Sequence, residues 1–520
     1  MESKHNFDLS VYLVTSPVAS FPSEDAYLKH LETALSSDAI TVLQLREKKL
    51  SDDAFLALAR KVKKLTDKAK VPLVINDNLF VCKEVGAEGL HIGWDDVGYE
   101  TARKELPEST FIGLSASTLD QALACARLKA DYIGLGPIFP TSSKPDANPP
   151  CFAYGAREIL EELSKLEGAP PVVGIGGIDE GNTEYLQWMC NDGRSGVTLD
   201  GVAVISAIMA SPQPDEAAKR LKELWERTTY TFAPKPVTLE VPSGTAFRTV
   251  LGKVREKKPL VHNMTNTVVQ TISANMLLAF HASPIMSLAS SEVEDLSKIC
   301  DGVVLNIGTL DESTSTLFTK AVAAYNAAGK VVVFDPVGAG ATKLRRETTK
   351  RILESGYITV IKGNASEIAT VAGDLAGSVA EQRGVDAVKS DSSVDVQAEL
   401  VLKVAKRYRT TVVQTGEVDI VSDGTRTWTL RNGTPLQELT TGAGCALGGI
   451  LAASVAAGGD VAGSCVVGLT AYNLAAERAA KVVGDSSPGS FVGVWVDEVH
   501  KAVKDAGAGG YDGARVELLK

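Results

Sequence analysis

Short apolar runs recur at regular intervals along the first part of the chain, separated by amphipathic segments. The runs are rich in β-branched residues and continuous rather than alternating, which is typical of parallel strands covered on both faces. They cover residues 11–16, 40–47, 72–77, 89–93, 111–116, 132–139, 171–178 and 201–205. In one intervening segment, Phe55, Leu58 and Val62 share a helical face. Eight strand–helix units in about 228 residues predict a (β/α)₈ TIM barrel over residues 1–228.

The rest of the chain alternates strands and helices without this eightfold regularity. Apolar runs at residues 285–289, 302–307, 331–336, 357–362, 411–415, 419–422 and 427–430 predict strands. Residues 267–280 and 443–457 predict long Ala-rich helices. This pattern predicts a three-layer α/β/α domain over residues 243–520. Residues 229–242 contain Pro234, Pro236 and Pro242 and predict a partly stiff linker between the two domains.

Composition narrows the class of protein. A chain of 520 residues is long enough for two domains, and its net charge of −11 argues against a nucleic-acid partner. The seven cysteines form no CxxC pair, which suggests neither a disulfide framework nor a zinc site. The N-terminal residues contain no apolar run, and no tract is long enough to span a membrane. We therefore expect a cytoplasmic protein with no membrane partner.

Polar residues gather where the barrel strands end, which is the face that carries chemistry in TIM barrels. Strand alternation places Gln44, Arg46 and Lys48 on one side, facing the barrel mouth. Asp77 follows the third strand and Asp96 the fourth. Each of these residues alone could have a purely structural role. An aspartate after a strand, for example, often caps a loop. Together, carboxylates and cations on one rim predict binding of Mg²⁺ and a diphosphate.

The first half resembles thiamine-phosphate synthase. The resemblance rests on the motifs at residues 44–48, 75–77, 91–96, 136–139 and 173–178. It implies that Asp77 and Asp96 bind Mg²⁺. It implies that the aminopyrimidine diphosphate contacts Gln44, Leu45, Arg46, Glu47, Lys48, Asn76, Ser115 and Lys144, and that the thiazole phosphate contacts Thr141, Ser142, Ser143, Gly177, Ile205 and Ser206. Two residues depart from the family pattern: Trp94 replaces a polar residue, and Ser143 replaces a threonine.

The second half has no P-loop motif but offers two Gly-rich segments, residues 335–342 and 440–445. The second opens a helix, where backbone amides and the helix dipole favour an anion. Cys445 lies at this helix N-terminus, a position expected to lower its pKa. It could act on a substrate hydroxyl or be a buried, inert thiol. Glu367 could organise Mg²⁺ and phosphate, or form a capping pair with Asn364.

These residues resemble hydroxyethylthiazole kinase, which has the ribokinase-like fold. Further matches are the motifs at residues 262–266, 282–286, 305–310 and 415–419. The resemblance implies that Met286 and Gly442 contact hydroxyethylthiazole, that Lys362 and Thr415 contact ATP, and that Cys445 occupies the catalytic position. Two departures are Lys362 in place of a common arginine and Ala443 in place of a common threonine. Lysine keeps the charge but loses the bidentate guanidinium.

Together the two halves resemble the fungal type of bifunctional thiamine-biosynthesis enzyme. This implies ATP-dependent phosphorylation of 4-methyl-5-(2-hydroxyethyl)thiazole. The thiazole phosphate then condenses with 4-amino-2-methyl-5-(diphosphooxymethyl)pyrimidine to give thiamine phosphate and diphosphate. Resemblance also implies a homo-oligomer built on a trimer of kinase domains. Two alternatives stay open: a regulatory or scaffolding protein that binds these ligands without turnover, or a chain with one active and one vestigial domain.

Overall fold

The computed structural model describes residues 7–94, 96–143, 148–191, 196, 198–233, 237–376, 393–506 and 511–519. The chain divides into two compact units, Met1–Tyr230 and Thr231–Lys520. Each unit has its own sheet and its own buried core.

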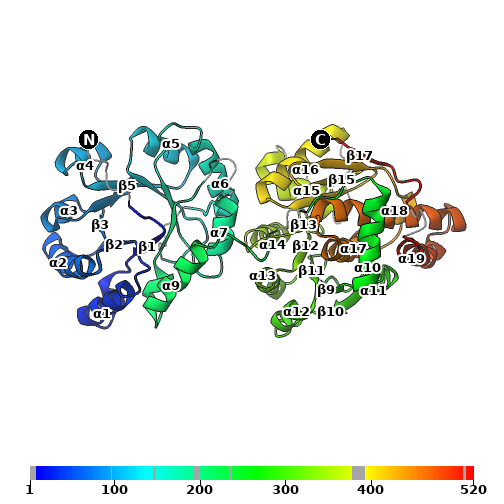
Figure 1. Cartoon of the computed structure of the whole chain (residues 1–520), viewed down its shortest axis with the longest axis horizontal. Helices are drawn as coiled ribbons and strands as arrows, with labels where there is room; N and C mark the ends of the chain where they lie inside the picture. The colour runs from blue at the N-terminus through cyan, green and yellow to red at the C-terminus, as the bar shows by residue number, and fades with distance from the viewer. Residues whose placement is uncertain are drawn as a thin grey trace. The chain divides into compact units, whose positions relative to one another are not determined.

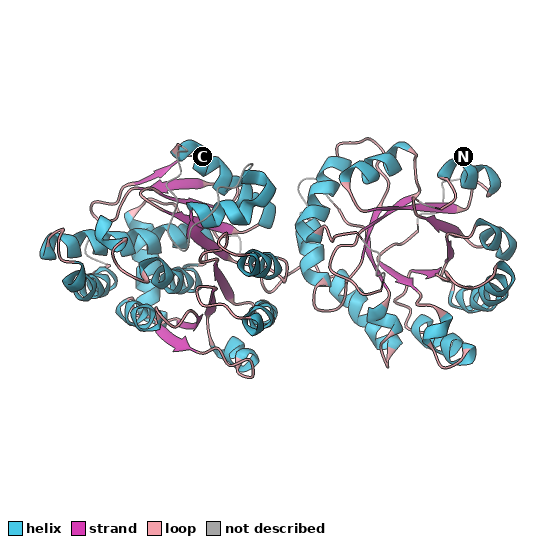
Figure 2. Ribbon diagram, turned by 180° about the vertical axis from the view of Figure 1, so that it is seen from behind, coloured by secondary structure: helices cyan, strands magenta, loops and turns pink. Residues whose placement is uncertain are grey.

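The first unit is a closed barrel of eight parallel strands ringed by helices (Figures 1 and 2). Each strand pairs with the next, and β8 pairs with β1 through Val11 and Val202. The strands are β1 (Val11–Val14), β2 (Val42–Leu45), β3 (Leu73–Asn76), β4 (Gly89–Ile92), β5 (Phe111–Ala116), β6 (Tyr132–Leu135), β7 (Val172–Ile175) and β8 (Gly201–Val204). The predicted TIM barrel is confirmed.

Helices of the barrel begin where the sequence supplies a capping side chain. Ser23, Ser51, Asn78 and Thr118 each accept the backbone N–H three residues ahead, which satisfies a donor that the first helical turn leaves free. The helices are α1 (Glu24–Leu35), α2 (Asp52–Ala69), α3 (Leu79–Val85), α4 (Tyr99–Glu105), α5 (Leu119–Arg127), α6 (Phe152–Leu163), α7 (Thr183–Cys190), α8 (Ser206–Met209) and α9 (Pro214–Trp225).

The second unit contains a nine-stranded sheet within the described residues, in the order β10-β9-β11-β12-β13-β14-β15-β16-β17. Pairing is parallel from β10 to β14 and antiparallel from β14 to β17. The strands are β9 (Leu260–Met264), β10 (Ser283–Met286), β11 (Gly302–Asn306), β12 (Val331–Asp335), β13 (Val360–Asn364), β14 (Thr411–Thr415), β15 (Asp419–Ser422), β16 (Thr427–Leu430) and β17 (Val516–Leu518).

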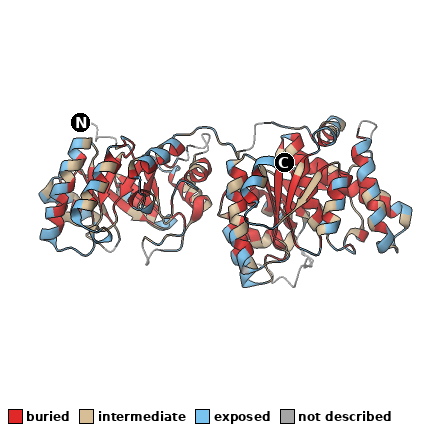
Figure 3. Ribbon diagram, turned by 90° about the horizontal axis from the view of Figure 1, so that it is seen from below, coloured by how far each residue is buried: buried red, intermediate tan, exposed pale blue. Residues whose placement is uncertain are grey.

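Helices cover both faces of this sheet, so the unit has three layers, as predicted (Figures 1 and 3). One core lies beneath α10 (Gly244–Lys257), α11 (Gln270–Ala279), α17 (Ala443–Gly458), α18 (Val461–Val483) and α19 (Pro488–Lys504). The other lies beneath α12 (Val293–Ile299), α13 (Glu312–Ala327), α14 (Lys343–Leu353), α15 (Ala365–Ala372) and α16 (Val394–Tyr408). Among the helices of the described residues, none is both long and apolar enough to cross a membrane.

The predicted linker, residues 229–242, is only partly described, because Pro234, Lys235 and Pro236 lie outside the described residues. Its C-terminal part lies on the second unit. The Leu239 N–H donates to Asp460 Oδ2 at 2.6 Å, and the Trp428 indole donates to the Val241 carbonyl at 3.3 Å. These hydrogen bonds hold the chain against the second unit just before helix α10 begins.

Candidate active sites

The rim of the barrel brings together the charged residues that follow its second, third and fourth strands. Asp77 has a left-handed backbone with φ +63°, and its N–H donates to the His91 carbonyl at 2.8 Å. Asp96 Oδ2 accepts the Gly93 N–H at 2.7 Å. Lys48 Nζ lies 3.4 Å from Asp77 Oδ2. The turns after β3 and β4 therefore fix two carboxylates beside one cation.

The electrostatics of this rim favour a bound cation. Burial raises the pKa of Asp77 to about 6, helped by its hydrogen bond to Asp96 and that group's charge, and opposed by Lys48. Two facing carboxylates repel unless a proton or a cation lies between them. Within the described residues, no cluster of three or more His, Cys, Asp or Glu could hold a metal. A pair of carboxylates matches the donor set of Mg²⁺, which takes one or two carboxylates and completes its shell with ligand oxygens.

Residues beside this pair offer further hydrogen-bonding groups. Asn76 Nδ2 is buried and has no hydrogen-bond partner among the described residues, so it is an available donor at the end of β3. The Trp94 indole donates to the Ser115 carbonyl at 2.8 Å. Gly93, Trp94 and Ser115 also line a cavity of about 190 Å³. Trp94, the departure noted above, thus ties the loop after β4 to the end of β5.

The side chains of the segment from Gln44 to Lys48 differ in burial and in hydrogen-bond partners. Leu45 is fully buried, and Glu47 accepts the Val18 N–H at 2.5 Å. Burial raises the pKa of Glu47 despite that hydrogen bond. Arg46 is half-buried, and its N–H donates to Thr15 Oγ1 at 3.0 Å. Glu47 therefore holds the loop after β1, whereas Lys48 is at the carboxylate pair.

The residues expected to hold the thiazole phosphate lie on three neighbouring loops. Thr141 Oγ1 accepts the Ser143 N–H at 3.2 Å, and Ser142 is exposed. Gly177 has φ +65°, and a Cβ there would lie 2.4 Å from the Pro140 carbonyl oxygen. Ile205 and Ser206 open the short helix α8. Lys144, which was expected to contact the aminopyrimidine diphosphate, lies outside the described residues.

In the second unit, the ends of β11, β12 and β13 bring together a buried charged network. Lys362 Nζ lies 3.0 Å from Asp335 Oδ1 and donates to the Gly444 carbonyl at 2.9 Å. Asn306 Nδ2 donates to Asp335 Oδ2 at 2.8 Å. Burial alone would lower the pKa of Lys362, but the charges of Asp335, Cys445 and Glu367 and the hydrogen bond to Asp335 together outweigh it, so the pKa is raised. The lysine therefore stays charged beneath the Gly-rich start of α17.

Cys445 belongs to the same network but is not an activated thiol. Asn266 Nδ2 lies 3.7 Å from its sulfur and donates to Asn306 Oδ1 at 3.0 Å. Burial, together with the charge of Asp335, raises the pKa of Cys445 to about 11. The expectation of a lowered pKa is therefore wrong, because desolvation and the charge of Asp335 raise it.

Glu367 forms the capping pair that the sequence allowed, and its role toward Mg²⁺ and phosphate stays a prediction. It forms a capping box with Asn364, accepting that residue's N–H at 2.7 Å while its own N–H donates to Asn364 Oδ1. Its other oxygen accepts the Gly338 N–H at 2.9 Å, in the loop after β12. Burial and the charge of Asp335 raise the pKa of Glu367 to about 7. A buried carboxylate thus joins the ends of β12 and β13.

The remaining expected contacts occupy the same edge of the sheet. Met286 ends β10 and is half-buried. Gly442 has φ +90°, and a Cβ there would lie 2.8 Å from Ile272 Cγ2, so only glycine fits without strain. Thr415 ends β14, and its hydroxyl donates to the Gly363 carbonyl at 3.4 Å. Beside it, burial raises the pKa of Asp419 to about 7.

Sequence reasoning missed several polar residues of these networks. Asp335 and Asn306 each end a continuous apolar strand and are buried, a signal that a search for polar strand ends would have found. His91 belongs to the matched motif at residues 91–96, but neither it nor Tyr132 was assigned a role, because both lie within barrel strands, where the pattern predicts packing. Asn266 lies in the matched motif at residues 262–266, but no role was assigned to it.

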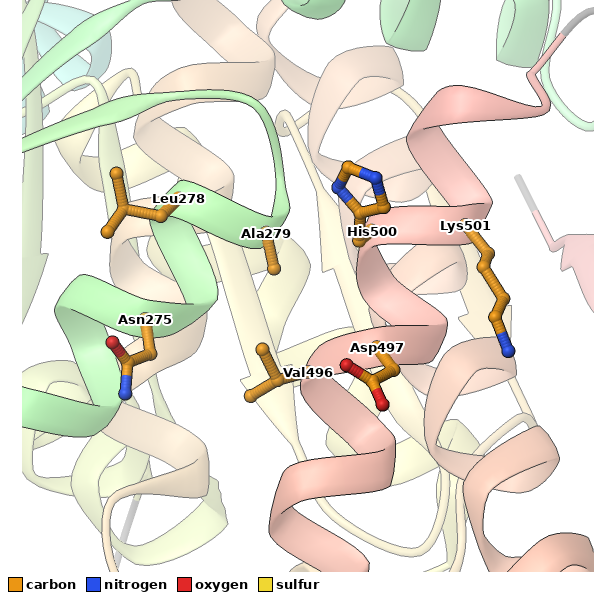
Figure 4. A pocket seen from close by; sticks show the side chains of 7 residues that line it. All are labelled: Asn275, Leu278, Ala279, Val496, Asp497, His500 and Lys501. Carbon is orange, nitrogen blue, oxygen red and sulfur yellow. The ribbon is translucent and has the colours of Figure 1, made fainter.

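A larger hollow of about 470 Å³ lies elsewhere on the second unit, between α11 and α19. Figure 4 shows Asn275 and Leu278 on one helix and Asp497 and His500 on the other. None of the residues expected to bind substrate lines it.

Comparison with known proteins agrees with this geometry. Residues 11–208 match the thiamine monophosphate synthase family, and residues 251–505 match the hydroxyethylthiazole kinase family. A probable thiamine biosynthetic bifunctional enzyme of Schizosaccharomyces pombe is 33% identical over 524 residues, covering 98% of each chain. The thiamine biosynthetic bifunctional enzyme of Saccharomyces cerevisiae is 32% identical, covering 87% of each chain.

One half of the chain also has single-domain relatives. A hydroxyethylthiazole kinase of Haemophilus influenzae is 44% identical over 232 residues, which are 44% of this chain and 86% of that one. With both family matches and a relative that spans nearly its whole length, the chain belongs to the family of thiamine biosynthetic bifunctional enzymes.

Proposed function

We propose that this chain catalyses two consecutive reactions of thiamine biosynthesis. The second unit phosphorylates 4-methyl-5-(2-hydroxyethyl)thiazole with ATP, and the barrel joins the product to 4-amino-2-methyl-5-(diphosphooxymethyl)pyrimidine. The observation that carries this proposal is the 33% identity with a probable bifunctional enzyme over 98% of both chains. The charged residues on both strand edges support it, because a leaving diphosphate and a transferred phosphoryl group both need charge stabilisation there.

In the barrel, Asp77 and Asp96 would hold Mg²⁺, and Arg46, Lys48 and Lys144 would bind the diphosphate. When bound, Mg²⁺ supplies charge neutralisation for the leaving diphosphate. The bond between the pyrimidine methylene and the diphosphate breaks, and the thiazole nitrogen forms the new bond to that carbon. The protein's part is positioning and charge stabilisation, so no side-chain nucleophile is required. The loops after β6, β7 and β8 would hold the thiazole phosphate.

In the second unit, the first amides of α17 would face the transferred phosphoryl group. Lys362 holds this segment through the Gly444 carbonyl and adds a positive charge beneath it. Lys362 and Thr415 would contact ATP, while Met286 and Gly442 would contact the thiazole. With a pKa of about 11, Cys445 is a poor base at neutral pH. We therefore assign it a contact with the substrate hydroxyl, and assign most of the rate to positioning and charge.

We also propose the domain boundaries, the cellular location and the oligomeric state of the protein. We place the domain boundaries at residues 1–228, 229–242 and 243–520, and the protein in the cytoplasm, where its seven free thiols would stay reduced. We propose a homo-oligomer built on a trimer of kinase domains, which a light-scattering mass of the purified chain would test.

The test of function uses the purified full-length chain. With ATP, Mg²⁺, the thiazole alcohol and the pyrimidine diphosphate, we expect thiamine phosphate and diphosphate. Omitting ATP should stop the reaction, and supplying the thiazole phosphate in its place should restore it. Binding of all substrates without any product would instead support the regulatory alternative. Product from the thiazole phosphate only would show that the kinase domain is vestigial.

A further inference from the structure

A chain of hydrogen bonds crosses the interior of the barrel beneath the proposed synthase site. Gln44 Nε2 donates to the Tyr12 hydroxyl at 3.0 Å, and the Tyr12 and Tyr132 hydroxyls lie 2.8 Å apart. His91 continues the chain, with Nδ1 3.0 Å from the Tyr132 hydroxyl and Nε2 3.0 Å from Ser115 Oγ. We call these five residues the barrel relay. Its two ends, Gln44 and Ser115, are both expected ligand contacts.

The neighbouring strands make room for the relay. A Cβ at Gly113 of β5 would lie 2.0 Å from the Tyr132 ring, and one at Gly134 of β6 would lie 2.9 Å from the His91 ring. Tyr12 and Tyr132 are almost completely buried. Two phenols and an imidazole in a barrel core are costly unless every polar atom is paired. The glycines and the complete pairing show that these side chains form one packed unit.

The relay has a direction, because each phenol has a single proton. Gln44 donates to Tyr12, so the Tyr12 proton goes to Tyr132, and the Tyr132 proton goes to His91 Nδ1. His91 then carries its proton on Nε2 and donates to Ser115 Oγ. With the Gln44 amino group facing Tyr12, the opposite direction would leave the Tyr12 proton without an acceptor among these five residues, a cost that paired buried groups avoid.

The direction determines what each end offers to a ligand. Ser115 Oγ accepts from His91, so its own proton is free to be donated outward. Gln44 uses its amino group inside the barrel, so Oε1 is left to accept a hydrogen bond. An aminopyrimidine diphosphate carries a matching donor, its amino group, and a matching acceptor, its diphosphate oxygens.

We propose that the barrel relay couples recognition of the pyrimidine amino group at Gln44 to the donor that Ser115 presents to the diphosphate. Tyr12, Tyr132 and His91 are then positioning residues of the synthase reaction, none of which needs to touch the substrate. This inference rests on the proposed roles of Gln44 and Ser115.

The test is Tyr132→Phe in the full-length chain, which removes only the central hydroxyl. We expect kcat/KM for the pyrimidine diphosphate to fall about tenfold, the effect of one lost hydrogen bond in the transition state. KM for the thiazole phosphate and the kinase half-reaction should not change. Tyr27→Phe is the matched control, because it removes a hydroxyl from a buried tyrosine of α1 outside the relay.

A double-mutant cycle separates positioning from general damage. In a Ser115→Ala background, Tyr132→Phe should cost less than about twofold, because the relay acts through Ser115. NMR of the ¹⁵N-histidine-labelled chain should show the Nε2–H tautomer for His91, with its signal assigned by His91→Gln. Three results would each overturn the relay while leaving the proposed function intact. They are fully additive effects of the two substitutions, a Tyr132→Phe enzyme with unchanged activity, and the Nδ1–H tautomer of His91. An unimpaired Ser115→Ala enzyme would overturn the role of Ser115 and the relay together.

Discussion

At the scale of single residues, Cys445 shows how surroundings decide chemistry. Its place at the start of α17 would favour a thiolate, but the side chain is half-buried, and desolvation and the charge of Asp335 raise its pKa. The pKa of about 11 leaves only about one thiol in ten thousand ionised at pH 7. The residue can still contribute by contact with the substrate hydroxyl.

This assignment predicts the pH dependence of the kinase half-reaction. A reaction limited by the Cys445 thiolate would accelerate about tenfold per pH unit up to its pKa. We expect kcat to change less than about threefold between pH 7.5 and 9, because positioning does not require the thiolate. Initial rates with saturating substrates would measure this, with the synthase half-reaction as a control for pH effects on the chain. A slope near one that disappears in Cys445→Ala would restore the base role.

Sequence predicted some residue roles and not others, for physical reasons. Lys48 and Asp77 were expected on one rim, since strand ends converge in a barrel, and they lie 3.4 Å apart. The raised pKa of Cys445 was not predictable, because it depends on Asp335 and on burial that only the folded sheet creates.

At the scale of elements, glycine turns decide how the loops of the barrel pack. Gly177 and Gly168 both have positive φ, but a Cβ meets the Pro140 carbonyl oxygen at Gly177 and nothing within 4 Å at Gly168. We expect Gly168→Ala to cost about 1 kcal/mol from backbone strain alone. Gly177→Ala should cost about 2 to 4 kcal/mol and lower synthase activity, because the loops after β6 and β7 must separate.

Urea unfolding and synthase rates of the two variants would check this comparison. Equal losses of stability would show that the close approach at Gly177 contributes nothing. Unchanged synthase activity in a folded Gly177→Ala chain would remove this turn from the proposed phosphate site.

The residue at the C-terminus of helix α14, Glu354, allows a prediction of how the stability of the second unit depends on pH. Burial raises the pKa of Glu354 to about 8, and Lys350 lies 3.9 Å away, too far for a hydrogen bond. Since the folded pKa exceeds the ordinary 4.5, the stability from this group is fully present below pH 4.5. It is lost as pH rises through about 8. The negative end of the helix dipole acts in the same direction.

Glu354→Gln should therefore match the parent chain at pH 4.5. At pH 9 it should be more stable by on the order of 4 kcal/mol, because no charge is buried. Denaturant unfolding of the second unit at both pH values would measure this. Glu347→Gln, on the same helix but exposed, is the control and should show no such pH-dependent gain. An equal gain at both pH values would contradict the titration.

Sequence predicted the existence of the elements better than their ends. The run at 132–139 gives a strand that stops at Leu135, because Pro137 has no N–H for the ladder. The run at 171–178 stops at Ile175, where Gly176 and Gly177 turn with positive φ. Strand β9 was missed because His262 and Asn263 interrupt its apolar pattern, although both are buried and hydrogen-bonded.

At the scale of the whole molecule, the two folds differed in how far sequence could predict them. Eight repeats of one strand–helix unit can close into a barrel in one simple order, and the observed order is sequential. The order of the second sheet, where β9 lies between β10 and β11, was not predicted. The strand order depends on which face of the sheet each connecting helix covers. The local pattern of apolar and polar residues does not predict this.

Two complete domains in one chain predict separable activities. Asp77→Ala should lower the synthase half-reaction by at least about tenfold and spare the kinase, because it removes one of two carboxylates from the cation site. Cys445→Ala should lower only the kinase half-reaction. Each half-reaction is measured with its own substrates, and circular dichroism checks folding. Loss of both activities in either variant would indicate misfolding or coupling between the domains.

The same pair of variants tests whether the thiazole phosphate must stay with one chain. If it is released to solvent, an equimolar mixture of Asp77→Ala and Cys445→Ala should make thiamine phosphate from the alcohol at about half the parent rate per chain, after a lag. The lag reflects accumulation of free intermediate to the KM of the synthase. Dilution should lengthen the lag of the mixture. If the parent chain shows no lag at any dilution while the mixture does, the intermediate passes directly between sites, and fusion of the two domains has a kinetic role.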